Sequence, residues 1–258
     1  METSVVASEV DKRVVIITGD KGGVGKSTFA RGLLQLYINR GLNCLAYDSD
    51  KSNSQLYRHY NSAGLGVNLI DIFTRGGADD LMIDLDSKRP RLALVDLPAQ
   101  ARTFFEDFEK DLGVFDAVKS LGYQITMVSV VSRVKDSVNV LRLLFDYCGH
   151  QTNYVVVKNL FHTAGDETKF ECYDDSETRK SVLEFGGVEI LMPDLFYKAY
   201  DFIDRKNMSF GEVLTTNDPE VNIAIRSRIA AWMKTFEENA LLASALLGLE
   251  TDAGTQAA

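Results

Sequence analysis

Hydrophobic residues along the chain follow two patterns that alternate. Short runs that are apolar almost throughout, such as 13–18 (RVVIIT) and 123–131 (YQITMVSVV), are typical of strands buried on both faces of a sheet. Longer segments carry apolar residues three or four positions apart, as 27–40 does, and these predict amphipathic helices. We predict further buried strands over 43–47, 91–95, 154–157 and 188–192.

The remaining helical pattern lies between these strands and after the last one. We predict helices over 69–86 (with a break at Gly76-Gly77), 136–147, 178–185 and 221–249, and a long connection without helix or strand over 160–176. Strands that alternate with helices are typical of a parallel sheet covered on both faces. The sequence therefore predicts an α/β fold, doubly wound around a mainly parallel sheet of about seven strands.

One domain accounts for the whole pattern. No internal repeat, low-complexity block or Pro/Ser-rich linker divides the chain of 258 residues. We predict a flexible leader over 1–12, one domain over 13–250 and a flexible tail over 251–258.

Composition narrows the class of protein. Hydrophobic residues make up 45% and charged residues 25%, which is ordinary for a globular protein. The net charge of −9 argues against a surface devoted to nucleic acid but leaves room for a local basic patch, so DNA is a possible partner that the net charge does not favour. Three scattered cysteines suggest reduced thiols, and the absence of a signal peptide or a long apolar run predicts a cytoplasmic protein that does not bind the membrane.

The stretch GDKGGVGKST (19–28) carries the clearest chemistry. It lies between a predicted strand and a predicted helix, where glycines let backbone N–H groups approach phosphate oxygens at a helix N-terminus. Lys26 is placed to reach the β- and γ-phosphates, and the Ser27 hydroxyl to bind Mg²⁺. The predicted nucleotide-binding residues of this loop are Gly22, Gly23, Val24, Gly25, Lys26, Ser27 and Thr28.

The loop departs from the usual P-loop because it has Asp20 at the first glycine position and a second lysine, Lys21. The order Lys-Gly-Gly-Val-Gly-Lys-Ser resembles the deviant Walker A motif of the ParA/MinD family of P-loop ATPases. The resemblance implies that Lys21 contacts the nucleotide of a partner subunit in a face-to-face homodimer formed on ATP. Lys21 and Lys26 would then both be catalytic.

Three aspartates follow predicted strands, where ligands bind in open parallel sheets. Asp48 and Asp50 resemble the D-x-D segment of the family, and Asp96 resembles its Walker B aspartate. The resemblance implies that Asp50 orients or deprotonates the attacking water, and that Asp48, Asp96 and Ser27 hold Mg²⁺. A single aspartate at a strand end is more often only a turn residue, and Lys51-Ser52 replaces the family's usual Pro-Gln after Asp50.

Two later residues indicate which nucleotide base the site binds. The chain has no N-K-x-D motif typical of guanine recognition. Asn159 matches the family position that binds adenine, and Pro193 matches the loop that closes over the base. An asparagine at a strand end is equally well explained as a turn former. ATP is therefore the expected nucleotide.

The resemblance implies a Mg²⁺-dependent ATPase that dimerises on ATP and moves or partitions a cargo through an activating or adaptor protein. The accessory ATPases of plasmid conjugal transfer and stability are the most similar subgroup. Two alternatives stay open: a nucleotide-gated binding module with incidental hydrolysis, and a metabolic ligase or synthase built on a related loop. The segment 129–141 (SVVSRVKDSVNVL) resembles the family's dimer and partner face, although a capped helix start explains it equally well.

Overall fold

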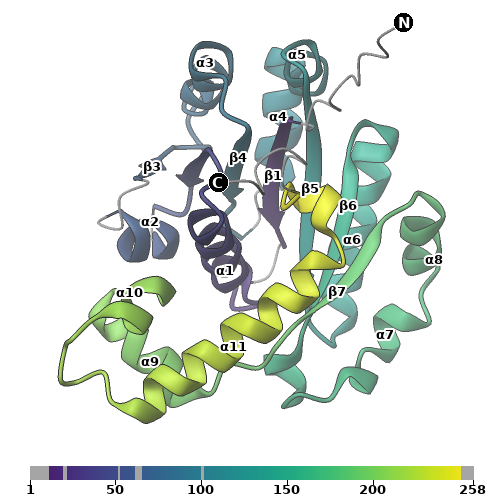
Figure 1. Ribbon diagram of the computed structural model, residues 1–258. Coiled ribbons are helices and arrows are strands. Elements are labelled where there is room, and N and C mark those ends of the chain that lie inside the picture. Colours follow the sequence, from purple (N-terminus) through teal and green to yellow (C-terminus); the bar gives the residue numbers. More distant parts are fainter. Residues whose placement is uncertain (1–11, 20–21, 52, 62–65, 100–101, 251–258) are drawn as a thin grey trace, which may run out of the picture.

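A computed structural model describes residues 12–250 except 20–21, 52, 62–65 and 100–101. The sheet is all-parallel, with the strand order β3-β2-β4-β1-β5-β6-β7, which confirms the predicted doubly wound fold (Figure 1). The predicted tail and the leader up to residue 11 lie outside the described residues. The strands are β1 (Lys12–Thr18), β2 (Cys44–Asp48), β3 (Val67–Leu69), β4 (Leu92–Asp96), β5 (Tyr123–Val131), β6 (Asn153–Asn159) and β7 (Val188–Met192).

The helices connect these strands and pack on both sides of the sheet. They are α1 (Lys26–Asn39), α2 (Gln55–Tyr60), α3 (Asp79–Lys88), α4 (Arg102–Leu112), α5 (Val114–Ser120), α6 (Lys135–Cys148), α7 (Glu171–Asp174), α8 (Glu177–Glu184), α9 (Tyr197–Lys206), α10 (Phe210–Thr215), α11 (Ile223–Leu241) and α12 (Ser244–Leu247). Three short 3₁₀ helices, η1 (Gly149–Gln151), η2 (Leu160–Thr163) and η3 (Glu167–Lys169), complete the described elements. None of the described helices is long and apolar enough to cross a membrane.

Each face of the sheet has its own core, because successive strand residues point to opposite sides. Val15 and Ile17 of β1 pack with α1, α2 and the helices from α9 to α12. Val14 and Ile16 pack on the other face with the helices from α3 to α8. Every residue from Val14 to Ile17 is buried, as the unbroken apolar run predicts.

The last helices return to pack against α1, the first helix of the chain (Figure 1). The Phe236 ring lies edge-on to Phe29 and so close to Gly32 that a Cβ there would lie 2.8 Å from the ring. The Tyr37 hydroxyl donates to the Leu247 carbonyl oxygen at 2.6 Å. The apolar stripe of 221–249 is therefore core, divided between α11 and α12.

The structure corrects two predictions. The first half of the helix predicted over 69–86 is wrong, because Leu69 ends the edge strand β3 and turns follow as far as α3. In these turns a Cβ on Gly77 would collide with the carbonyl oxygen of Asp71. The connection predicted over 160–176 instead contains η2, η3 and α7, which are too short to show a helical period.

Candidate functional site

The glycine-rich loop joins β1 to α1 at the carboxyl edge of the sheet. Gly25 caps α1 with φ +100°, a conformation that L side chains rarely adopt. A Cβ on Gly25 would also collide with Nδ2 of Asn159 and lie 2.9 Å from Cε of Met192. Only glycine therefore lets the loop lie against the ends of β6 and β7 while α1 begins at Lys26.

Lys26 opens α1 and is 8% exposed, and Ser27 and Thr28 follow it in the first turn. The first N–H groups of a helix have no partner within it, so this turn favours an anion. Gly22, Gly23 and Gly25 line the same cavity as these three side chains. The structure therefore brings six of the predicted loop residues together in one cavity. Val24 is instead buried and does not line this cavity, and Lys21 lies outside the described residues.

Asp48 ends β2 and is fully buried. Its Oδ1 accepts the backbone N–H of Asp50 at 3.0 Å, and its Oδ2 accepts that of Tyr57 in α2 at 3.0 Å. Burial raises the pKa of Asp48 to about 6, against the effect of these two hydrogen bonds. Asp48 thus shapes the turn that carries Asp50, and its predicted role in the Mg²⁺ shell stays a prediction.

Asp96 ends β4 next to Asp48 of β2 in the register of the sheet. It is 1% exposed, and neither carboxylate oxygen makes a well-formed hydrogen bond to any described residue. Burial, and then the charge of Asp48, raise the pKa of Asp96, while the nearby Ser27 and Lys26 oppose the shift. A buried carboxylate of this kind is well suited to a cation.

Asp50 lies in the turn after β2, where it lines the cavity beside the phosphate loop. Its Oδ1 accepts the backbone N–H of Asn53 at 3.1 Å, and its carbonyl oxygen accepts the Ser54 hydroxyl at 2.8 Å. The Ser49 hydroxyl donates to the Asp96 carbonyl oxygen at 2.7 Å, which ties this turn to the end of β4. The turn that carries Asp50 is therefore bonded both to the end of β4 and to the residues that lead into α2.

The cavity has a volume of about 320 Å³ and two chemically different ends. The polar end, which we call the phosphate end, comprises the loop and three residues after β2: Gly22, Gly23, Gly25, Lys26, Ser27, Thr28, Asp50, Asn53 and Gln55. The mainly apolar end, which we call the nucleoside end, comprises Asn159, Phe161, Met192, Pro193, Leu195 and Tyr200. This division fits a nucleotide, whose charge is concentrated at its phosphates.

Asn159 joins the two ends. Its Nδ2 donates to the Val24 carbonyl oxygen at 2.7 Å, and its Oδ1 accepts the Phe161 N–H at 3.1 Å. The amide keeps one N–H and one acceptor site, which leaves capacity for an adenine. Pro193 also lines the cavity, and its carbonyl oxygen accepts the indole N–H of Trp232 at 2.7 Å. Direct contact of Asn159 and Pro193 with adenine stays a prediction.

Several residues at the nucleoside end were not predicted from the sequence. Phe161 follows Asn159 by two positions and Leu195 follows Pro193 by two, so their neighbourhood was the only signal. No motif in the sequence pointed to Tyr200, and the helix α9 that carries it was not predicted. Its place in the cavity depends on tertiary packing.

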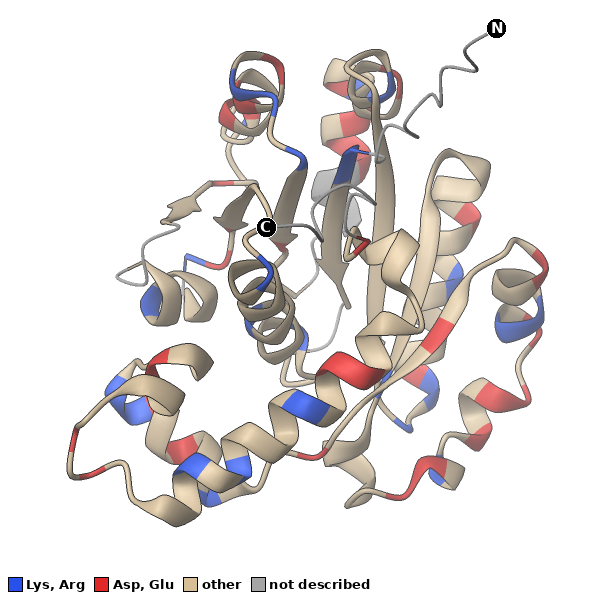
Figure 2. Cartoon of the chain, in the orientation of Figure 1, with Lys and Arg blue, Asp and Glu red and all other residues tan. Residues whose placement is uncertain are grey.

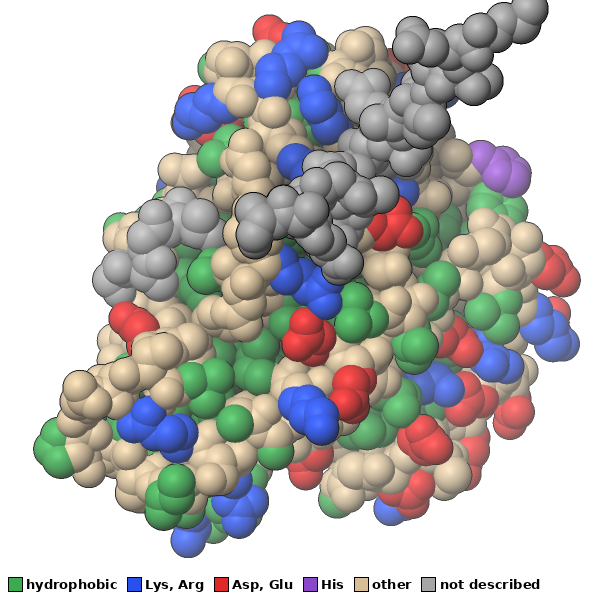
Figure 3. Space-filling view, in the orientation of Figure 1, with side chains coloured by type: hydrophobic (Ala, Val, Ile, Leu, Met, Phe, Trp, Pro, Cys, Tyr) green, Lys and Arg blue, Asp and Glu red, His purple; other side chains and the backbone are tan. Residues whose placement is uncertain are grey.

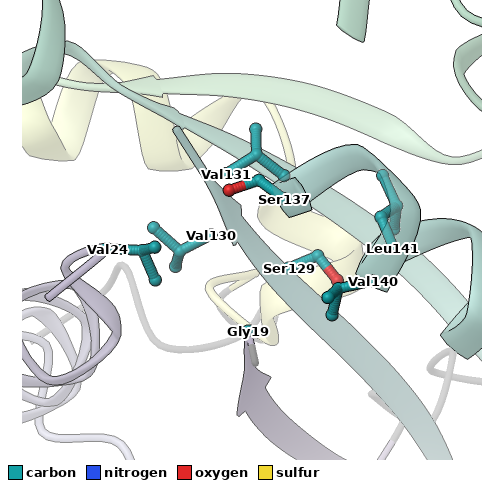
Figure 4. A pocket seen from close by; sticks show the side chains of 8 residues that line it. All are labelled: Gly19, Val24, Ser129, Val130, Val131, Ser137, Val140 and Leu141. Atoms are coloured by element: carbon teal, nitrogen blue, oxygen red, sulfur yellow. The ribbon is translucent and has the colours of Figure 1, made fainter. Parts of the chain in front are cut away.

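A second, much smaller cavity of about 10 Å³ lies behind the phosphate loop, between β5 and α6 (Figure 4). Ser137 begins the buried face of α6, and its Oγ lies 2.9 Å from Oγ of Ser132. The space is that of about one water molecule. Its lining residues are Gly19, Val24, Ser129, Val130, Val131, Ser137, Val140 and Leu141, so the segment resembling a partner face packs against the loop.

Basic side chains on α9 and α11 do not form a continuous basic field (Figures 2 and 3). Lys206 pairs with Glu220 and Asp218. Arg226 donates to the carbonyl oxygens of Leu214 and Thr216. These contacts give Lys206 and Arg226 structural roles.

A family model described as the CobQ/CobB/MinD/ParA nucleotide-binding domain matches residues 15–224. The chain belongs to this family. The predicted resemblance to ParA and MinD is therefore confirmed, and the match spans the phosphate loop, the three aspartates and both ends of the cavity.

Individual relatives are distant. The chain is 28% identical over 221 residues to Protein MobD of Acidithiobacillus ferrooxidans, covering 86% of this chain and 93% of that protein. The septum site-determining protein MinD of Pyrococcus horikoshii, complexed with Mg-ADP, is 16% identical with a TM-score of 0.48, covering 92% and 98%. A plasmid partition protein of Borrelia burgdorferi bound to AMPPNP is 14% identical with a TM-score of 0.49, covering 91% and 98%.

Proposed function

We propose that the protein is a Mg²⁺-dependent ATPase that dimerises face to face on ATP and cycles by hydrolysis to position, partition or transfer a cargo. One observation carries the hydrolytic part of this proposal. Asp50 lines the same cavity as Lys26 and Ser27, and the buried Asp96 lies near both of these side chains. Phosphoryl transfer needs this combination of positioned cation, metal site and water-orienting carboxylate.

Each side chain has a part in the proposed reaction. Lys26 and the N-terminal N–H groups of α1 bind the β- and γ-phosphates. Asp50 orients the attacking water or takes its proton, and its turn is fixed by Asp48 and Ser49. Thr28 donates to the α-phosphate.

The residues present fit a magnesium ion. Ser27 offers a hydroxyl oxygen, and Asp96 offers two buried carboxylate oxygens that make no well-formed hydrogen bond among the described residues. Bound Mg²⁺ would neutralise the charge that develops on the phosphates. A cation bound at this site would oppose the raised pKa of Asp96 and favour its ionised form.

The dimeric part of the proposal rests on Lys21 and is tested by size. Light scattering after size-exclusion chromatography should show a monomer with ADP and a dimer with ATP and Mg²⁺, and Lys21→Ala should weaken the dimer. Lys51→Ala is a matched control, because Lys51 is exposed and pairs with Asp71 instead. A monomer under every condition, with nucleotide bound, would reject the dimer cycle.

A nucleotide-gated binding module and a metabolic ligase or synthase remain the competing functions. Asp50→Ala distinguishes the gated binding module from the proposed ATPase. A cycling ATPase should lose both hydrolysis and its cellular role, whereas a gated binder should keep that role. Product analysis with ATP alone distinguishes the ligase or synthase from the proposed ATPase, since a ligase needs a co-substrate before it releases phosphate. The cargo we propose is plasmid DNA or a protein complex, reached through an adaptor protein.

A further inference from the structure

Tyr200 is an aromatic residue that lines the nucleotide cavity from a distant helix. It lies in α9, and it is half-buried. It shares the cavity with Thr28 of the phosphate loop and with Leu195 of the β7–α9 connection. An aromatic ring in this place gives the nucleoside end a flat apolar wall.

Beneath Tyr200 lies Arg31, one turn after Thr28 in α1. Arg31 is 0% exposed, and none of its three side-chain nitrogens has a hydrogen-bond partner among the described residues. Its guanidinium carbon lies 5.9 Å from the centre of the Tyr200 ring and 5.1 Å from that of Phe210. Burial lowers the pKa of Arg31, but a guanidinium stays charged in proteins.

A buried cation whose guanidinium makes no hydrogen bond is costly, so its contacts with aromatic rings matter more than they would at the surface. The two rings hold Arg31 from α9 and α10, and Arg31 in turn limits where the Tyr200 ring can lie. Tyr60, Tyr200 and Asp204 oppose the lowering of the Arg31 pKa by burial, and two of these three residues belong to α9.

We infer that Tyr200 forms the wall against which the base and ribose of the nucleotide pack, and that Arg31 is the positioning residue that holds this wall. The inference rests on the proposed binding of ATP. Tyr200 would then contact the nucleoside in addition to the features already predicted to bind the nucleotide, which are the phosphate loop, Asn159 and the Pro193 loop.

Two probes separate the ends of the cavity: ATP with Mg²⁺, and inorganic tripolyphosphate with Mg²⁺, which lacks base and ribose. Calorimetric titration of Tyr200→Ala should show ATP binding weakened about tenfold, the size expected for loss of an aromatic contact with a base. Its affinity for tripolyphosphate should equal that of the wild type, and Tyr200→Phe should bind ATP as the wild type does.

Tyr197→Ala is the matched control, because Tyr197 lies in the same helix, is exposed and does not line the cavity. It should leave both affinities unchanged. Arg31→Met should weaken ATP binding roughly threefold in the wild type and have no further effect in Tyr200→Ala, since the cation acts through the ring. A structural role of Arg31 alone would give the same loss in both backgrounds.

The outcomes distinguish this inference from the proposed function. If the wild-type protein binds neither ATP nor tripolyphosphate, the proposed function itself is wrong. If the wild type binds ATP and Tyr200→Ala binds it equally well, Tyr200 is not a wall of the nucleoside site. Equal weakening of ATP and tripolyphosphate by Tyr200→Ala would also overturn the inference, because the damage would lie in the phosphate loop.

Discussion

The two ends of the nucleotide cavity are built in opposite ways. Six of the nine residues of the phosphate end are near neighbours in the chain, between Gly22 and Thr28, and backbone N–H groups of this loop would face the phosphates. The nucleoside end collects side chains from the ends of β6 and β7 and from α9, more than a hundred residues later. A local motif can therefore specify the phosphate chemistry, whereas recognition of the nucleoside depends on the completed fold.

The largest effect should come from the phosphate end. Lys26→Ala should reduce ATP hydrolysis about 100- to 1000-fold, the loss typical when one preorganised charge-stabilising group is removed. Steady-state phosphate release measures this. Binding of tripolyphosphate should fall together with binding of ATP. Loss of ATP binding alone would mean that the two ends are not separate.

Gly25 is the point at which the two ends touch. Gly25→Ala should lower the free energy of unfolding by about 2–4 kcal/mol, because it combines a positive φ with a collision against Asn159. Gly22→Ala is its control, since a Cβ there meets no atom within 4 Å. Denaturant unfolding without nucleotide compares them. Equal stability of the two variants would contradict the close contact between loop and β6.

Asp96 should show a trade between stability and function. Its folded pKa is raised above the unfolded value of 3.8, so it costs no stability below that value, and the cost grows as the pH rises through the folded pKa. In EDTA, Asp96→Asn should be more stable than the wild type by about 1–3 kcal/mol near pH 8 and close to equal near pH 4. Hydrolysis should be lost. A pH-independent difference would exclude ionisation as the cause.

We expect the smallest effect at Asn159, which lies between the phosphate end and the nucleoside end. Asn159→Ala should lower the free energy of unfolding by about 1 kcal/mol, the value of the hydrogen bond to the Val24 carbonyl oxygen, and should weaken ATP binding more than tripolyphosphate binding. Asn153→Ala, at the other end of β6, should change neither affinity. Thermal unfolding and titration give both quantities.

The same contrast explains what the sequence could predict. The middle of β1 is a continuous apolar run because its residues are buried on both faces of the sheet. β7 has the predicted bounds although Glu189 interrupts its apolar run, since its other four residues are apolar. β3 was missed because its three residues include two exposed ones, Asn68 and Leu69, so neither a run nor a period exists. Asp48 was predicted as a metal ligand, but the pattern gave no sign of its hydrogen bond to Tyr57 in a helix that was also missed.

The packing of α1 against α11 and α12 has a consequence for synthesis of the chain. The phosphate loop and its helix leave the ribosome early, but Tyr37 meets the Leu247 carbonyl oxygen only after another 210 residues. At ordinary translation rates this delay is roughly 10–40 s. During that time one side of α1, including Phe29, lacks the Phe236 ring that later covers it. The nascent chain therefore carries its nucleotide-binding element unfinished for most of its synthesis, in a form that chaperones can bind.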